Sequence, residues 1–305
     1  MANRKRKGRE VSGWLCLDKP PSMTSTQAVS LVKRLYGAAK AGHAGTLDPL
    51  ATGVLPIAFG DATKTVPFVQ DGRKVYRFTV LWGVETDTDD AEGKPVETAE
   101  ARPAAEAIRA LLPSFTGELM QRPPAFSAIK IEGARAYDLA RSGEAVVIEE
   151  RPVVIHRLDL VDQPDQDHAV FEAECGKGTY VRSLARDMGR KLGCLGHVVA
   201  LRRLVVGPFD DAVMIGPDQL TEAGGSGGHA ALDNLLKPVA FVLGELPEVV
   251  LLPPDATRLR RGQAVLLRGN SCPAAAPIAH ATLAGETVAI GEIAQGEFHP
   301  RRIFR

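Results

Sequence analysis

The chain has 305 residues, of which 45% are hydrophobic and 24% are charged, and its formal net charge at pH 7 is zero. This composition is typical of a globular protein with one large domain and a smaller one, and it excludes an intrinsically disordered chain. No apolar run is long enough to span a bilayer, and Cys16, Cys175, Cys194 and Cys272 have neither zinc-site nor disulfide-framework spacing, so we expect a reducing cytoplasm and no membrane.

Charge is unevenly distributed along the sequence. Basic residues cluster between Arg4 and Arg9 and again between Arg182 and Arg203, whereas much of the acid falls between Glu85 and Glu92. Domains that bind nucleic acids usually carry a basic excess, which the whole chain lacks. A basic face on a neutral protein is still compatible with this distribution, and the first cluster is typical of a solvated tail.

The first predicted elements are a strand at 13–17 and a helix that Ser25 or Thr26 caps. The segment 42–53, GHAGTLDPLATG, follows and places a carboxylate on a glycine-flanked turn. Because the ring of Pro49 disfavours the α region for the residue before it, Asp48 is expected on a turn. Taken alone, an aspartate before a proline is more often a helix N-cap. A carboxylate fixed on a loop also suits a nucleophile or general base.

Strands are predicted next at 54–59 and 75–82, and the alternation in the second strand places Tyr76 on a sheet edge or floor. Further predicted elements are helices at 104–112 and 137–141, strands at 153–160 and 169–175, and a helix at 179–192 that Thr179 caps. Helices and strands mix without a strict alternation, so the predicted fold class is α/β mixed, of the α+β type.

The sequence changes character near its C-terminal end. The run GGSGG at 224–228 predicts a flexible insertion at a domain edge. Short strands separated by glycine and polar turns then predict a small β-barrel-like module. These strands are expected at 249–252, 264–267, 277–283 and 287–293. We therefore predict two domains, at 1–246 and 247–305.

The segment 42–53 resembles the catalytic motif of the bacterial tRNA pseudouridine-55 synthases. Four more segments resemble the same family in the same order, namely LDKPPSMTS at 17–25, QRPPAFSAIK at 121–130, GTYVRSLARD at 178–187, and LRR at 201–203 with VGPF at 206–209. The resemblance implies a pseudouridine-synthase-like mixed sheet flanked by helices, followed by a small β-rich, PUA-like RNA-binding domain. It implies an isomerase that flips the T-loop uridine at position 55 of tRNA and converts it to pseudouridine without a cofactor or metal.

The resemblance also assigns roles to individual residues. Asp48 would be the essential carboxylate, Arg182 would hold its charge, and Tyr76 would stack on the target base or take a proton. Tyr180 would be a second tyrosine of the site, and Leu201 would close the pocket. Without the family, the ordinary interpretations are a surface arginine for Arg182, a half-buried strand tyrosine for Tyr76, a buried tyrosine at a helix start for Tyr180 and a core leucine for Leu201.

Three further residues would bind the substrate or orient the site. His43 would brace the vacancy that the flipped base leaves, Asp90 would orient Arg182 or Tyr76, and Lys130 would meet a phosphate of the loop. A structural histidine, a solvated acidic turn and a surface lysine are the alternatives. The acidic run lacks an EF-hand pattern, because Ala91 stands at a ligand position.

Several alternatives remain open from the sequence. The carboxylate could add to the pyrimidine ring or act at the sugar. A tRNA-binding and folding chaperone that acts independently of catalysis, and an enzyme for another RNA with a T-loop-like fold, are the competing functions. We expect a cytoplasmic monomer that binds the T-stem-loop of tRNA, with no protein partner implied.

Overall fold

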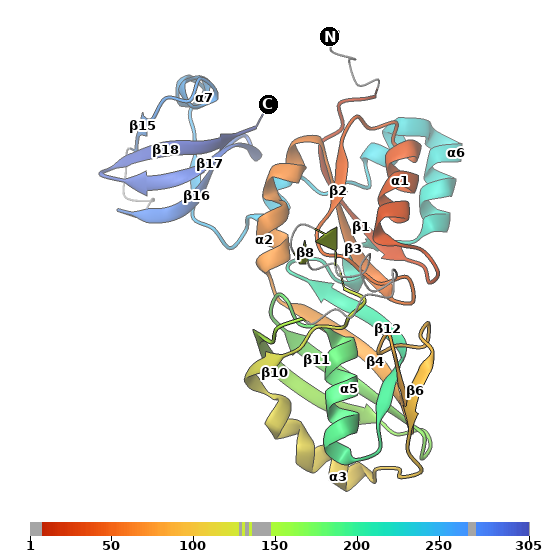
Figure 1. The fold of residues 1–305 in the computed structure, drawn as a ribbon. Helices are drawn as coiled ribbons and strands as arrows, with labels where there is room; N and C mark the ends of the chain where they lie inside the picture. Colours follow the sequence, from red (N-terminus) through yellow and green to blue (C-terminus); the bar gives the residue numbers. More distant parts are fainter. Residues whose placement is uncertain (1–7, 128–129, 132–133, 136–147, 268–272, 305) are drawn as a thin grey trace.

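The computed structural model describes residues 8–127, 130–131, 134–135, 148–267 and 273–304 (Figure 1). The helix predicted at 137–141, the basic residues from Arg4 to Lys7, and Cys272 lie outside this part of the chain. A large mixed sheet with helices packed against it is followed by a smaller sheet in the C-terminal part. The expected mixed α+β fold is therefore confirmed.

Within the described residues, the large sheet has nine strands in the order β13-β1-β3-β12-β4-β11-β10-β7, with β2 paired to β3. The strands are β1 (Gly13–Lys19), β2 (Ala41–His43), β3 (Thr52–Phe59), β4 (Lys74–Trp82), β7 (Gly117–Gln121), β10 (Arg151–Asp162), β11 (His168–Cys175), β12 (Gly196–Val206) and β13 (Met214–Ile215). β12 runs parallel to β3 and antiparallel to β4. It therefore connects the N-terminal strands to the remainder of the sheet.

Strands β1 and β3 are buried on both faces of the sheet. In β1, Leu15 and Leu17 belong to the larger hydrophobic core, whereas Trp14 and Cys16 belong to a second core. This division follows from the two-residue period of a strand, which sends successive side chains to opposite faces. The larger core takes side chains from α1 (Ser25–Leu35), α3 (Ala105–Leu111), α5 (Val181–Leu192) and α6 (Pro217–Asp233), and the second from η1 (Gly60–Thr65), α2 (Val66–Asp71) and η4 (Val239–Val242).

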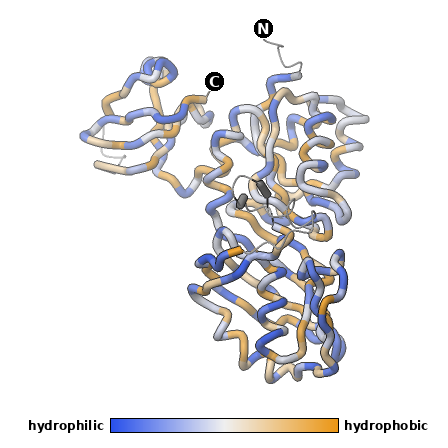
Figure 2. Tube along the Cα trace, in the orientation of Figure 1, coloured by the Kyte–Doolittle hydropathy of each residue, from blue (hydrophilic) through white to orange (hydrophobic). Residues whose placement is uncertain are grey.

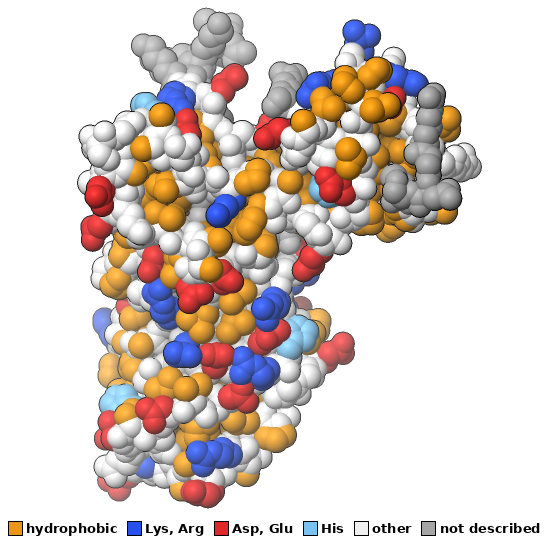
Figure 3. Space-filling view, turned by 180° about the vertical axis from the view of Figure 1, so that it is seen from behind, with side chains coloured by type: hydrophobic (Ala, Val, Ile, Leu, Met, Phe, Trp, Pro, Cys, Tyr) orange, Lys and Arg blue, Asp and Glu red, His pale blue; other side chains and the backbone are white. Residues whose placement is uncertain are grey.

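The outer face of β4, β10 and β11 is polar. Glu172 of β11 pairs with Arg77 of β4 at 3.0 Å and with Arg157 of β10 at 2.6 Å. Hydrophobic and hydrophilic positions alternate along these strands (Figure 2), and acidic and basic side chains are interspersed on the face seen from behind (Figure 3). The strands predicted from alternation at 75–82, 153–160 and 169–175 are confirmed within two residues at each end.

Two predicted helix starts are wrong. α1 is capped by Thr24, which forms a capping box with Gln27, because Ser25 is engaged with Leu47 in the loop after β2. α5 begins at Val181, and its N-cap residue Tyr180 makes no side-chain capping bond. The predicted cap, Thr179, instead donates to the carbonyl of Gly176.

The glycine-rich run at 224–228 is not the flexible insertion that its composition predicts. It lies inside α6, with a local break at Gly228, where φ is +60°. Leu220 and Leu232 on either side of the run are buried in the larger core. Packing of these two leucines therefore outweighs the low helix propensity of glycine.

The C-terminal module has its own sheet and core. Among the described residues its strand order is β14-β16-β17-β18-β15. The strands are β14 (Glu248–Val250), β15 (Val265–Leu266), β16 (Ala276–Leu283), β17 (Glu286–Ala294) and β18 (Glu297–Ile303), with α7 (Pro253–Arg260) against them. The predicted strands are confirmed in type, whereas β18 and α7 were not predicted.

Short elements complete the structure. They are η2 (Leu112–Phe115), η3 (Asp211–Val213), and the two-stranded pairs of β5 (Val84–Thr86) with β6 (Pro95–Thr98) and β8 (Lys130–Ile131) with β9 (Ala134–Arg135). Lys64 in η1 donates to the carbonyl of Ile303 at 2.6 Å and so ties the module to the larger domain. Among the helices described, none combines the length and the hydropathy that crossing a bilayer requires.

Candidate active site

Asp48 lies on the loop between β2 and β3, and not at the start of a helix. The helix-cap interpretation is therefore wrong. The loop is fixed at Leu47, whose backbone N–H donates to Ser25 Oγ at 2.8 Å and whose carbonyl accepts from the same hydroxyl at 3.0 Å. Ala51 N donates to the carbonyl of Asp48 at 3.1 Å and closes a tight turn. The carboxylate thus projects from a backbone that hydrogen bonds hold on both sides of Asp48.

Lys19 stabilises the same turn through hydrogen bonds to backbone carbonyls. Its side chain is fully buried, and its ammonium group donates to the carbonyls of Met23 at 2.7 Å, Pro20 at 2.9 Å and Pro49 at 3.2 Å. Burial lowers the pKa of Lys19 to about 8, although the charge of Asp48 opposes this shift. The residue after Asp48 is therefore held by a charge-assisted hydrogen bond.

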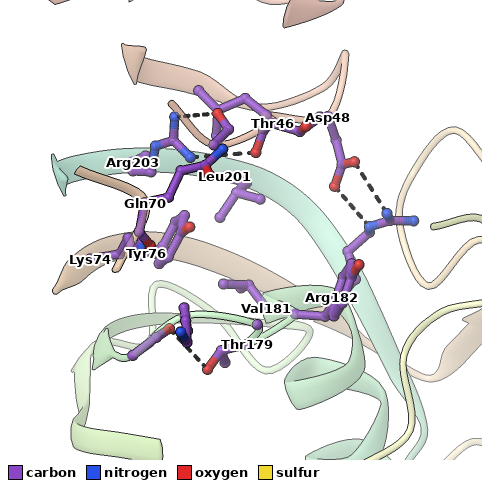
Figure 4. Close-up of a pocket in the computed structure, with 16 residues that line it drawn as sticks. Thr46, Asp48, Gln70, Lys74, Tyr76, Thr179, Val181, Arg182, Leu201 and Arg203 are labelled. Carbon is purple, nitrogen blue, oxygen red and sulfur yellow. Dashed lines mark hydrogen bonds and ion pairs between the residues drawn. The ribbon is translucent and has the colours of Figure 1, made fainter. Parts of the chain in front are cut away.

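Arg182, in the first turn of α5, faces Asp48 (Figure 4). Its Nε lies 2.9 Å from Asp48 Oδ2, and a terminal nitrogen donates to Oδ1 at 3.2 Å. The arginine side chain is 5% exposed and the aspartate 34%, so the cation is buried while the carboxylate reaches the cavity. The two-point contact with the guanidinium therefore fixes the orientation of the carboxylate.

Arg182 is itself oriented by the turn after β5. Its Nη1 donates to the carbonyl of Thr88 at 2.8 Å and lies 3.4 Å from Asp90 Oδ2. Arg182 also donates to the carbonyl of Phe126 at 3.0 Å. The structure therefore brings Asp48, Arg182 and Asp90 into one ion-paired network, of which Arg182 and Asp90 are buried.

The network continues along α5. Arg186, one helical turn after Arg182, pairs with Asp89 at 2.8 Å, and both side chains are 8% exposed. Arg190 in the following turn pairs with Glu85. Burial raises the pKa of Asp89 to about 6, against the effect of Arg186. Arginines spaced by four residues thus fasten one face of α5 to the acidic run 85–90.

A cavity of about 310 Å³ adjoins this network (Figure 4). Tyr76 of β4 and Leu201 of β12 line it together with Asp48, Arg182 and Tyr180. Among the described residues that line it, Asp48 is the one carboxylate, whereas the cations are Lys74, Lys177, Arg182 and Arg203. The lining therefore contains more basic than acidic groups, although Lys74 and Arg203 are themselves buried.

The two tyrosines of the cavity are neutral at pH 7. Burial raises the pKa of Tyr76, although the charge of Arg203 opposes this shift. Burial likewise raises the pKa of Tyr180, and the charge of Arg182 opposes this shift. The backbone of Tyr180 is held by the side chain of Gln121, which donates to its carbonyl and accepts from its N–H. Both rings therefore present apolar faces and an uncharged hydroxyl.

Neither His43 nor Lys130 is among the described residues that line the cavity. His43 ends β2 and does not line the cavity; its Nδ1 is buried without a described hydrogen-bond partner, and burial lowers its pKa. Lys130 lies in β8, and its side chain is outside the described part of the structure.

Lys19, Lys74 and Arg203 are cations of the site to which the sequence pattern gave no role. Lys19 and Arg203 fall within the segments that carry the family resemblance, and this position was the one sequence signal that could have indicated a role for them. All of them bond to backbone carbonyls.

Comparison with known proteins identifies two regions of the chain. Residues 33–181 match a family described as TruB family pseudouridylate synthase (N terminal domain), and residues 182–243 match the tRNA pseudouridylate synthase B C-terminal domain. A protein of Nitrobacter winogradskyi named tRNA pseudouridine synthase B is 58% identical over 302 residues, covering 98% of this chain and 84% of the relative. One of Agrobacterium fabrum with the same name is 56% identical, covering 99% and 97%.

Solved structures share the fold. A Cbf5-Nop10-Gar1 complex superposes with a TM-score of 0.71 at 23% identity, covering 96% of this chain and 84% of that one. An H/ACA RNP bound to a substrate RNA containing 2'-deoxyuridine gives a TM-score of 0.74 at 20% identity, covering 100% and 92%. None of these matches favours a folding chaperone that acts independently of catalysis.

Proposed function

The chain belongs to the TruB family of pseudouridylate synthases and isomerises uridine to pseudouridine in tRNA, and we propose that its target is the T-loop uridine at position 55. We propose also that Asp48 acts covalently. The observation that supports this role is the ion pair between Asp48 and the buried Arg182, at the edge of a cavity in which no other described lining residue is acidic.

The reaction breaks the bond between the ribose and a ring nitrogen, turns the base, and joins the ribose to a ring carbon. The ring carbon loses its proton and the nitrogen gains one, so there is neither net oxidation nor hydrolysis. An ionised carboxylate can begin this sequence by adding to the pyrimidine ring or by acting at the sugar. The contact with Arg182 suits either route, because it orients the carboxylate while 34% of the Asp48 side chain remains exposed.

The walls of the cavity suit an extruded pyrimidine. A uridine inside a folded loop must leave its stack before an enzyme can act on it, and an aromatic face compensates for the lost stacking. Tyr76 supplies this face; the alternative role, taking the proton, requires its phenol to ionise first, which its raised pKa opposes. Leu201 closes the pocket, and Tyr180 lines its other side. Asp90 acts through Arg182, which it orients.

The remaining assignments concern the RNA outside the pocket. His43 braces the loop that loses its base, and Lys130 meets a phosphate. We propose a catalytic domain at 1–246 and a PUA-like RNA-binding domain at 247–305, in a cytoplasmic monomer that binds the T-stem-loop. These roles are supported by the family to which the chain belongs.

The proposed target is tested by incubating the protein with an unmodified tRNA transcript and mapping pseudouridine by reverse transcription after carbodiimide treatment. We expect modification at position 55 in the whole tRNA and in an isolated T-stem-loop. A transcript with cytidine at that position is the matched control and should remain unmodified. Pseudouridine that forms at another position, or none at 55, would contradict the proposal.

A further inference from the structure

Arg203 is a buried cation whose role the reaction described above leaves open. Its side chain is 1% exposed, so it does not reach an RNA phosphate. Among the residues that the structure describes, no carboxylate lies within ion-pair distance of its guanidinium. A buried charge without a counter-ion is costly unless its donors are satisfied. The bonds that satisfy it therefore indicate what it does.

The guanidinium of Arg203 spans the loop that carries Asp48. Its Nε donates to the carbonyl of Val54 at 2.8 Å, after the turn. Its terminal nitrogens donate to the carbonyls of Gly45 at 3.1 Å and Thr46 at 3.4 Å, before the turn. One rigid planar group thus joins the two ends of the loop.

The sheet register places Arg203 beside Tyr76 as well. β12 lies between β3 and β4, and Arg203 is paired with Gly53 on one side and with Tyr76 on the other. Directly opposed residues of antiparallel strands present their side chains on the same face. The charge of Arg203 also acts on Tyr76, because it opposes the rise of the tyrosine's pKa that burial causes.

Gly53 permits this arrangement. Its φ is +96°, and a Cβ atom there would lie 2.2 Å from the carbonyl oxygen of Arg203. Any larger residue would therefore push β3 away from β12. The close approach of these strands places the guanidinium within reach of the loop.

We propose that Arg203 is a positioning residue that fixes the loop of Asp48 relative to Tyr76. The inference rests on the proposed function, because it concerns the geometry of that reaction. Figure 4 shows Arg203 and Tyr76 at one end of the cavity and Asp48 with Arg182 at the other. A flipped base held between them requires a defined separation of carboxylate and ring, since misplacement by about 1 Å can cost about 100-fold in rate.

The test compares Arg203→Lys and Arg203→Gln with Arg77→Met. Lysine keeps the charge but presents a single nitrogen, and glutamine keeps donors but lacks the charge. Arg77 is the matched control, because it follows Tyr76 on the same strand but pairs with Glu172 on the outer face and is 53% exposed. Thermal unfolding first establishes that each variant folds, and kcat and KM are then measured on a T-stem-loop.

We expect Arg203→Lys and Arg203→Gln to lower kcat about 100-fold with KM within about threefold of wild type. Arg77→Met should leave both constants unchanged. A folded Arg203 variant with the wild-type kcat would overturn the inference while leaving the proposed function intact, as would a variant that changes KM alone. If neither variant folds, Arg203 serves the whole fold and the inference is also overturned. An inactive wild type would contradict the proposed function and, with it, this inference.

Discussion

Asp48 and Arg182 are 134 residues apart in the sequence and meet through a contact of 2.9 Å between the carboxylate and Nε. The aspartate comes from a loop between two strands, and the arginine comes from the first turn of α5. The contact thus depends on the packing of that helix against the sheet. Residues that hold α5 in place consequently influence the carboxylate.

Replacement of Arg182 by lysine should impair catalysis more than folding. Lysine retains the charge, but one ammonium group cannot contact Asp48, Asp90 and the carbonyls of Thr88 and Phe126 together. We expect kcat to fall at least about 100-fold, as for loss of an oriented electrostatic donor. Arg190→Lys is the control. Arg190 lies on the same helix and pairs with Glu85, but it does not line the cavity. Equal rates for both variants would contradict the role of Arg182.

The close approach of β3 and β12 predicts a stability difference between two glycine variants. Gly53→Ala introduces a methyl group 2.2 Å from the carbonyl oxygen of Arg203, whereas Gly178 has a similar φ of +86° with open space around it. Gly178→Ala should cost about 1–2 kcal/mol from backbone strain alone. Gly53→Ala should cost about 1–3 kcal/mol more, because the strands must separate. Urea unfolding measures both, and equal losses would contradict the steric argument.

The raised pKa of Asp89 predicts a pH dependence of stability. Its folded value of about 6 lies above its ordinary value of 3.8, so the native state binds the proton more tightly than the unfolded chain. The contribution of this group is therefore present below about pH 4 and is lost as pH rises through 6. Relative to Asp89→Asn, the wild type should lose about 1–3 kcal/mol of unfolding free energy across this range. A difference that stays constant from pH 4 to 6 would contradict the shift.

The sequence predicts those strands whose side chains alternate, such as β4, because one face packs on a core and the other faces solvent. It does not predict β12, in which Arg202 and Arg203 are adjacent and the second is buried. The carbonyls that accept from Arg203 have no signature in the sequence. For the same reason, the role of Lys19 beneath the catalytic loop could not be derived from its residue type.

The helix starts and the structure of the glycine-rich run could not be predicted, because tertiary contacts that are absent from the local sequence pattern determine them. Ser25 looks like a suitable cap, but its hydroxyl is used by Leu47 across the loop, and Thr24 caps the helix instead. Within the site, the resemblance selected Asp48, Arg182 and Tyr76. Only the structure shows that these residues meet around one cavity and that Arg186 forms an ion pair with Asp89.

The most direct test of the central claim is tritium release from uracil C5 in a labelled T-stem-loop, compared between wild type and Asp48→Asn. Asparagine has nearly the same shape and retains an oxygen that can accept from Arg182, so folding and RNA binding should persist. Because the amide is not a nucleophile, we predict that release falls by at least about 1000-fold. Release at the wild-type rate from the folded variant would contradict the covalent role of Asp48.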